Sequence, residues 1–209
     1  MKPSHKNWLI FEINIFSFFY NFYFDFISPY SYLAHKKIEI IKKRKNINFK
    51  YKPVLVGGLH NLQGIIAPAF VKPKLKHMIN DSDLIAKKNN FNFIWNTKFP
   101  LNSLDIMRGY LFVNSDIKDL YLDVIFDAYW KDNLDISDVK ILETLLKKCN
   151  INSNIFFKNI KNQKIKDELK SLTYEAHDKE IFGVPTFVVD DIIFWGQDRL
   201  EFAMNEYNK

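Results

Sequence analysis

The fold of this 209-residue chain is decided by the stretch Phe24-Asp25-Phe26-Ile27-Ser28-Pro29-Tyr30-Ser31-Tyr32-Leu33-Ala34. An apolar, strand-like run gives way at Ser28 to a helical pattern, and serine is a favourable N-cap residue. Pro29 suits the first helical position, because its ring fixes φ near the helical value and the N–H that it lacks has no helical partner there. The stretch therefore predicts a helix N-terminus with one hydroxyl beside it, which is an arrangement suited to an anion.

Composition indicates a globular protein with a sizeable core, because 47% of the residues are hydrophobic and 16% are aromatic. The net charge is +6, but the 30 Lys and Arg residues are dispersed over the predicted helix surfaces. The densest basic run, residues 42–45, falls at the end of the first predicted helix, where cations complement the helix dipole. We therefore expect no nucleic-acid partner, while the basic balance attracts small anionic substrates.

The chain has a single cysteine, Cys149, so no disulfide can form within it. This favours a reducing compartment, and we expect a cytoplasmic protein. Without a supporting motif, Cys149 is predicted to be buried or half-buried and to take no part in catalysis. The five histidines lack the spacing of metal ligands, so no metal site is predicted. They are His5, His35, His60, His77 and His177.

Residues 1–20 are predicted to be an N-terminal extension, to which we assign no role. The apolar run 8–19 resembles a signal peptide, but Glu12 and Asn14 interrupt it and no small-x-small cleavage site follows. The run also lacks the roughly 20 uncharged apolar residues that a bilayer-spanning helix needs.

Strand and helix signals alternate along the rest of the chain. The first half predicts strands over 21–27 and 48–56, which are parallel because the helix over 29–44 crosses between them. Gly57-Gly58 then breaks the pattern and begins a loop. Helical spacing follows as far as about residue 180. The predicted helices cover 74–90, a segment capped by Asn102 or Ser103, 117–131, 137–148 and 162–180.

The last part of the chain returns to strand chemistry. Residues 186–189 and 192–195 flank the turn Asp190-Asp191 and predict a β-hairpin, which a final helix follows. The order β-α-β, helical block, β-β-α predicts an α/β, thioredoxin-like core with a large all-helical insertion. The expected division is a thioredoxin-like domain of residues 21–57 and 182–209, and a helical insertion domain of residues 58–181.

Three motifs stand together in this order: residues 24–34, Phe182-Gly183-Val184-Pro185-Thr186, and Phe194-Trp195-Gly196-Gln197-Asp198-Arg199-Leu200. Together they closely resemble the 2-hydroxychromene-2-carboxylate isomerases. That family belongs with the kappa-class glutathione transferases in the DsbA-like branch of the thioredoxin fold. The resemblance runs from about residue 20 to 207, and it implies a glutathione-dependent isomerase.

Thioredoxin-like oxidoreductases begin their first helix with Cys-x-x-Cys, whereas this chain has Ser28-Pro29-Tyr30-Ser31. Dithiol chemistry is therefore not available. A hydroxyl at a helix N-terminus suits a thiolate supplied from outside, which the resemblance implies is that of glutathione. Ser28 is then the catalytic residue, because its hydrogen bond lowers the pKa of the thiol; it is not a nucleophile. The resemblance assigns Pro29 and Tyr30 to the same glutathione site.

The resemblance also assigns the rest of the glutathione site. Val184-Pro185 matches the family's cis-proline loop, and the Val184 main chain pairs with the cysteinyl part of glutathione as an added strand does. Gln197 and Asp198 begin the last predicted helix, whose N–H groups receive the γ-glutamyl carboxylate. Asp198 pairs in turn with the γ-glutamyl ammonium group.

Each of these residues also has a structural interpretation. Ser28 can be an N-cap only, although a capping hydroxyl that accepts one hydrogen bond still has a proton to donate. Pro185 can be a trans residue at a strand start, and Asp198 a helix cap. Trp195 is expected to be a core residue rather than a ligand contact.

The resemblance also assigns residues to the second substrate. Asn102 and Arg108 occupy family-like positions that face a second-substrate site. Family members that bind glutathione often carry Asn in the loop after the second strand, where Ile65 aligns here. The resemblance further implies a homodimer with the helical insertion at its interface, and a second substrate that is a small electrophilic or aromatic-derived acid.

Three functions stay open at this point. In the isomerase, the glutathione thiolate adds reversibly to a conjugated substrate, the ring opens, and rotation followed by loss of glutathione gives the trans enone acid. A kappa-like glutathione transferase would instead form a stable conjugate. A non-enzymatic thiol-peptide binding protein is the third alternative, motivated by Ile65 and by the N-terminal extension.

Overall fold

The structure is a computed structural model that describes residues 20–45 and 47–207. Its strands are β1 (Tyr20–Phe24), β2 (Phe49–Pro53), β3 (Thr186–Val189) and β4 (Ile192–Trp195). Its α-helices are α1 (Pro29–Arg44), α2 (Val56–Leu62), α3 (Lys72–Asn89), α4 (Leu104–Phe112), α5 (Lys118–Trp130), α6 (Val139–Lys148), α7 (Ser153–Asn159), α8 (Gln163–Asp178) and α9 (Leu200–Tyr207). Short 3-10 helices are η1 (Pro68–Phe70), η2 (Ser115–Ile117) and η3 (Gln197–Arg199).

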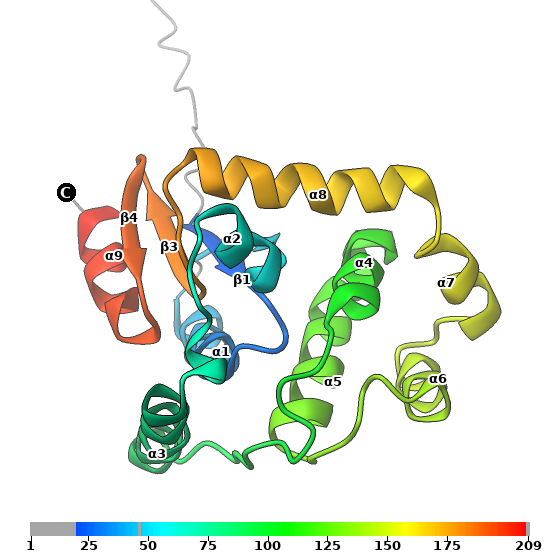
Figure 1. The fold of residues 1–209 in the computed structure, drawn as a ribbon, viewed down its shortest axis with the longest axis horizontal. Coiled ribbons are helices and arrows are strands. Elements are labelled where there is room, and N and C mark those ends of the chain that lie inside the picture. Colours follow the sequence, from blue (N-terminus) through cyan, green and yellow to red (C-terminus); the bar gives the residue numbers. More distant parts are fainter. Residues whose placement is uncertain (1–19, 46, 208–209) are drawn as a thin grey trace, which may run out of the picture.

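The strands form one mixed sheet in the order β2-β1-β3-β4 (Figure 1). β1 pairs with β2 in parallel and with β3 antiparallel, and β3 pairs antiparallel with β4. The predicted β-α-β and β-β-α halves of a thioredoxin-like core are thereby confirmed, with a long run of helices between them. In Figure 1, α4, α5, α6 and α7 lie to one side of the sheet, and α8 returns along them to reach β3.

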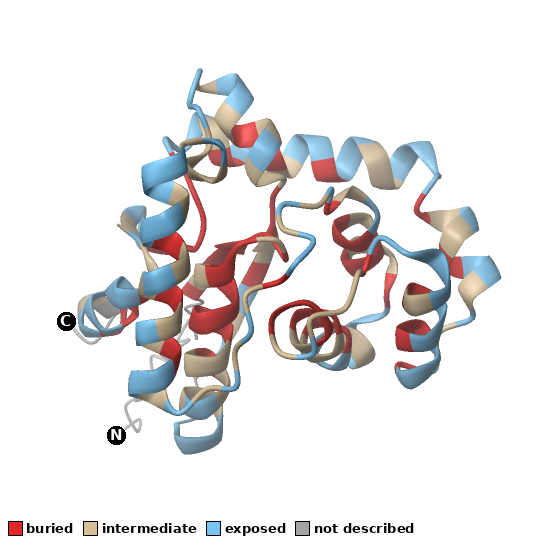
Figure 2. Cartoon of the chain, turned by 60° about the horizontal axis from the view of Figure 1, so that its bottom comes forward, coloured by how far each residue is buried: buried red, intermediate tan, exposed pale blue. Residues whose placement is uncertain are grey.

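Opposite faces of the sheet pack on different helices. Phe22, Phe24 and Phe187 are fully buried on the face that packs with α1, α4, α5 and α9. Tyr23 and Val188 point to the other face, where residues of α2 and α8 cover them. Burial of one such aromatic side chain contributes about 1.5–3 kcal/mol, so this double-sided core holds the sheet in place. Figure 2 shows the buried residues concentrated in the interior, with exposed residues along the outer sides of the helices.

Several predicted elements are confirmed at their bounds, and others differ. The first helix and both strands of the hairpin have the predicted limits. Asp190 and Asp191 form the hairpin turn with φ of 47° and 63°, so the turn has positive φ without glycine. α7 was not predicted; Asn152 caps it by accepting a hydrogen bond from the Ile155 amide at 3.0 Å.

The prediction of a loop from Gly57-Gly58 is wrong, because these two residues lie within α2. The helix owes its formation to tertiary packing rather than to propensity. Leu59 is fully buried against the residues of α8, and the Thr173 hydroxyl of α8 accepts a hydrogen bond from the Leu55 amide at 3.1 Å. β1 also ends at Phe24, three residues earlier than predicted.

The predicted N-terminal extension lies, apart from Tyr20, outside the described residues. Tyr20 is the first residue of β1. Within residues 20–45 and 47–207, no helix has the length and apolarity that crossing a membrane requires.

We expect Gly109→Ala, in α4, to lower the free energy of unfolding by about 1–3 kcal/mol, because overpacking a dense core forces its neighbours apart. A Cβ at this position would lie 2.3 Å from the Tyr121 hydroxyl and 2.5 Å from Phe156, and both of these side chains are fully buried. Urea denaturation measures the change. The matched control is Gly57→Ala in α2, where nothing lies within 4 Å of the added Cβ. Alanine there should raise stability by up to about 1 kcal/mol, and equal losses in the two variants would contradict this packing of α4.

Candidate functional site

Ser28 lies at the N-terminus of α1, with its backbone extended at φ −87° and ψ 116°. Its Oγ accepts a hydrogen bond from the Ser31 amide at 3.1 Å and donates one to the Val184 carbonyl oxygen at 3.3 Å. Pro29 follows as the first helical residue, and the first turn of α1 contains no acidic side chain. The hydroxyl therefore lies at the positive end of the helix dipole, which no acidic side chain of the first turn offsets.

Asp25 fixes the loop that carries Ser28. This side chain is fully buried, and its two carboxylate oxygens accept hydrogen bonds from the amides of Ile27 at 3.2 Å and Val56 at 3.0 Å. The Ser28 amide donates to the Asp25 carbonyl oxygen at 3.1 Å, and the Trp130 indole donates to the loop from α5. Burial raises the pKa of Asp25 to about 6, although its hydrogen bonds act to lower it. One carboxylate thus joins the start of α1 to the start of α2.

The Val184–Pro185 peptide bond is cis, as predicted. It directly precedes β3 and lies against Ser28 through the hydrogen bond to the Val184 carbonyl oxygen. The Pro185 carbonyl oxygen accepts a hydrogen bond from the Gly196 amide at 2.9 Å. The two motifs that lie more than 150 residues apart in the chain are therefore adjacent in the fold.

Ser28 lines a mainly apolar cavity of about 600 Å³. Apolar side chains from several segments of the chain form most of its wall: Ile27, Leu55, Val56, Ile65, Ile66, Phe70, Phe99, Leu101, Phe182 and Trp195. The expectation that Trp195 is a core residue is wrong, because its side chain is 52% exposed. It lies at the end of β4, and its ring packs on Phe182 at a centroid distance of 4.8 Å.

A second, more polar cavity of about 790 Å³ adjoins the first. The six residues predicted to form the glutathione site together with Ser28 each line one or both of these cavities. They are Pro29, Tyr30, Val184, Pro185, Gln197 and Asp198. Tyr30, Val184 and Trp195 line both cavities, and Lys74, His77 and Arg199 add basic groups to the second. The Tyr30 hydroxyl donates to Asp81 at 2.8 Å, which ties α1 to α3.

Gln197 and Asp198 begin a 3-10 turn, η3, and α9 starts only at Leu200. Gln197 is 8% exposed, and its side-chain and main-chain oxygens accept hydrogen bonds from Lys37 Nζ at 2.5 and 3.3 Å. Burial lowers the pKa of Lys37. Asp198 pairs with Arg199 at 3.2 Å, and its side chain is 55% exposed. Lys37 was missed at the sequence level, because nothing in a helical run of lysines marks the one that turns inward.

The two predicted second-substrate residues lie in different places. Asn102 lines the apolar cavity with Ser28, and its Oδ1 accepts a hydrogen bond from the Leu104 amide at 2.9 Å. Arg108 lines a different cavity, of about 500 Å³, and does not line the Ser28 cavity. Ile65 lines the apolar cavity and is 38% exposed.

His60 also lines the apolar cavity, from α2, and sequence reasoning gave it no role. Burial lowers its pKa, so its imidazole is neutral at neutral pH, and its Nδ1 is buried without a hydrogen-bond partner. No local signal in the sequence would have placed it, because α2 forms over Gly57 and Gly58 through tertiary packing. Cys149 is 1% exposed, which confirms its burial, and burial raises its thiol pKa to about 11. Among the described residues, no three His, Cys, Asp or Glu side chains gather as metal ligands would.

Residues 21–208 match the family described as the DSBA-like thioredoxin domain. The chain belongs to this family. Among relatives of this DSBA-like chain is the 2-hydroxychromene-2-carboxylate isomerase of Sphingobium xenophagum, which is 27% identical over 87% of this chain and 94% of that protein. The human glutathione S-transferase kappa 1 is 24% identical over 86% of each chain. A solved structure of 2-hydroxychromene-2-carboxylate isomerase has the same fold, with a TM-score of 0.84 and 21% identity, and it covers 91% of this chain and 94% of that one.

We expect Asp25 to make stability fall as pH rises from about 4 to about 6. Because its folded-state pKa is raised to about 6, the folded protein holds this proton more tightly than the unfolded chain does. The associated stability is complete below the unfolded-state pKa and is lost as pH passes the folded-state value, by up to about 3 kcal/mol. The measurement is urea denaturation at several pH values in the wild-type protein and in Asp25→Asn, and the difference between their profiles isolates this carboxyl. The exposed Asp116 provides the control, since Asp116→Asn should keep the wild-type profile.

Proposed function

We propose that this protein is a glutathione-dependent isomerase of the 2-hydroxychromene-2-carboxylate type, in which Ser28 stabilises the glutathione thiolate. The observation that carries the proposal is the position of the Ser28 hydroxyl. It stands at the N-terminus of α1, beside Val184, where a polar cavity adjoins an apolar one. The names of the isomerase and kappa transferase relatives support the same chemistry.

In this proposal the polar cavity holds the peptide part of glutathione. The Val184 main chain pairs with the cysteinyl unit, and this directs the sulfur toward Ser28. The γ-glutamyl end lies at Gln197 and Asp198, where the Asp198 carboxylate pairs with the ammonium group. The basic side chains of Lys74 and Arg199 line the same cavity and favour the carboxylates of the tripeptide.

Ser28 and the α1 N-terminus then act on the sulfur. The Ser28 hydroxyl donates a hydrogen bond to the thiolate. This hydrogen bond replaces the 3.3 Å hydrogen bond to the Val184 carbonyl oxygen. This bond and the helix dipole both favour the charged form, so the thiol pKa falls. Ser28 keeps its own proton throughout and forms no covalent bond.

The apolar cavity holds the second substrate, a small electrophilic or aromatic-derived acid. The thiolate forms a bond to a conjugated carbon, and the electron pair that it displaces moves to the substrate oxygen as the ring opens. Rotation about the resulting single bond and loss of the thiolate give the trans isomer and return glutathione unchanged. Apolar walls favour this exchange because they bind the aromatic body and exclude water, while the Asn102 amide lies at the same cavity.

We expect Ser28→Ala to raise the pKa of bound glutathione by about one unit, because one hydrogen bond to the thiolate is lost. Thiolate absorbance near 240 nm, followed against pH with glutathione bound, measures this value. The matched control is Ser31→Ala in the same helical turn, since the Ser31 hydroxyl is buried without a hydrogen-bond partner and does not line the cavity. An unchanged thiol pKa in Ser28→Ala, with glutathione still bound, would refute the catalytic role of Ser28.

We expect Asp198→Asn to weaken glutathione binding by about tenfold, because an ion pair with the γ-glutamyl ammonium group is lost. Isothermal titration calorimetry measures the dissociation constant. Asp190→Asn, in the turn between β3 and β4, is the control and should bind glutathione as the wild-type protein does. Equal affinity in Asp198→Asn and wild type would exclude the proposed γ-glutamyl position.

Turnover separates the isomerase from the other two functions. With 2-hydroxychromene-2-carboxylate as substrate, the isomerase forms the trans acid while free thiol, titrated with Ellman's reagent, stays constant. A kappa-like transferase consumes the thiol in proportion to product when an electrophile such as 1-chloro-2,4-dinitrobenzene is supplied. Binding of glutathione without turnover of either compound would favour the thiol-peptide binding protein, and absence of glutathione binding would reject both enzymatic functions.

A further inference from the structure

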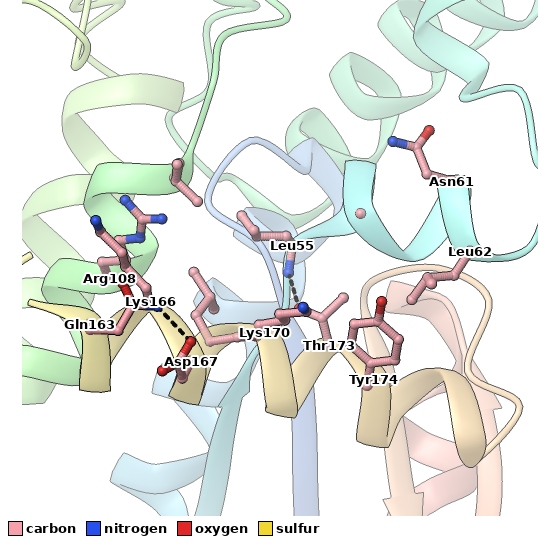
Figure 3. A pocket seen from close by; sticks show the side chains of 13 residues that line it. Leu55, Asn61, Leu62, Arg108, Gln163, Lys166, Asp167, Lys170, Thr173 and Tyr174 are labelled. Carbon is pink, nitrogen blue, oxygen red and sulfur yellow. Dashed lines mark hydrogen bonds between the residues drawn. The ribbon is translucent and has the colours of Figure 1, made fainter. Parts of the chain in front are cut away.

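A third cavity, of about 500 Å³, lies between α2, α4 and α8 (Figure 3). Its wall consists of Leu55, Gly58, Asn61, Leu62, Leu104, Arg108, Gln163, Lys166, Asp167, Leu169, Lys170, Thr173 and Tyr174. Only Leu55 and Gly58 also line the Ser28 cavity, and no residue assigned to glutathione belongs to this third cavity. This cavity is therefore separate from the Ser28 cavity. We call it the acid cavity.

Positive charge gathers at one end of the acid cavity. Figure 3 shows Arg108 of α4 beside Lys166 and Gln163 of α8, while Leu62 and Tyr174 lie toward the opposite end. Lys170, also of α8, lies nearer the other end, with its Nζ 5.6 Å from the centroid of the Tyr174 ring. Because residues 163, 166, 167 and 170 recur at helical spacing, one face of α8 presents them to the cavity together.

The one ion pair that Arg108 makes among the described residues is long. Its side chain is only 17% exposed, and its Nε is buried without a hydrogen-bond partner. Its nearest carboxylate, Asp105, lies 4.0 Å away, which is too far for a hydrogen bond. Asp167 is the one acidic residue in the wall, and its Oδ1 accepts a hydrogen bond from Gln163 at 2.8 Å. Buried donors are normally satisfied, so this guanidinium has capacity for an anionic ligand.

Leucine side chains and the hydrogen-bonded Thr173 form the middle of the wall. Leu62, Leu104 and Leu169 supply aliphatic surface. The Thr173 hydroxyl donates to the Leu169 carbonyl oxygen at 2.9 Å and accepts from the Leu55 amide. Its proton is therefore already used within the protein and cannot be donated to a polar ligand. A ligand that fits this wall carries one anionic group and an apolar body.

We propose that the acid cavity binds a small amphipathic carboxylic acid. Its carboxylate pairs with Arg108 and Lys166, because the planar guanidinium fork matches the two carboxylate oxygens. Its apolar body packs along Leu104 and Leu169 toward Leu62. The site is independent of the proposed glutathione chemistry, since it neither contains Ser28 nor shares a residue with the glutathione site.

Titration of the full chain with benzoate, followed by amide shifts in two-dimensional NMR, tests this site. We expect saturable shifts at Leu104, Leu169 and Thr173, and we expect none with benzamide, which has the same shape without the charge. Arg108→Gln should weaken benzoate binding by about tenfold and Lys166→Gln by a smaller factor. Lys164→Gln is the matched control, because Lys164 lies in α8 and does not line the cavity.

Several outcomes would overturn the proposal. They are equal binding of benzamide and benzoate, shifts confined to Ser28 and Trp195, and unchanged affinity in both Arg108→Gln and Lys166→Gln. If Arg108→Gln fails to fold, Lys166→Gln decides, because Lys166 is partly exposed and makes no ion pair among the described residues. Calorimetry with glutathione keeps the two proposals apart, since glutathione affinity should be the same in Lys166→Gln as in the wild-type protein whether or not benzoate binds.

Discussion

The geometry of the site depends on one buried carboxylate. Asp25 accepts hydrogen bonds from the loop before α1 and from the first residue of α2, so two segments that β2 separates in sequence are held at a fixed spacing. The loop ends on Ser28, and α2 forms one wall of the Ser28 cavity. A buried carboxylate whose pKa is raised is costly to the fold when it is charged. The amide donors that it satisfies offset only part of this cost, since its pKa stays raised, and the same hydrogen bonds fix the loop geometry.

The small mixed sheet packs against the large helical block because both of its faces are covered by helices. One face is aromatic and packs on α1 and α5, while the other face packs on α2 and α8. Because α8 contacts both the sheet and α4, it connects the helical block to the core along its whole length (Figure 1). The cavities lie where these layers meet, so each is lined by residues from distant parts of the sequence.

The fold was predictable from sequence because its signals are local. The Ser28-Pro29 N-cap, the periodicity of α1 and the Asp190-Asp191 hairpin turn each act over a few residues, and the three motifs fixed the family. What the sequence did not reveal depends on long-range contacts. α2 forms over two glycines because Leu59 is buried and the Thr173 hydroxyl accepts a hydrogen bond from the Leu55 amide. Lys37 donates a hydrogen bond to Gln197, which lies 160 residues further along the chain. Arg108 was placed by resemblance, and only the position of α4 beside α8 shows that it lines a cavity other than that of Ser28.

Trp195 and Gly183 are in close contact, since a Cβ on Gly183 would lie 2.9 Å from the Trp195 indole nitrogen. The indole therefore packs directly on the Gly183 backbone, and Trp195 lines both the polar and the apolar cavity. Any side chain introduced at position 183 must displace the ring and so alter both cavities at once. Divergence toward new substrates therefore has little freedom at this pair of residues. It has more freedom at Ile65, Ile66 and Phe70, between α2 and α3, whose exposed side chains line the apolar cavity and not the polar one.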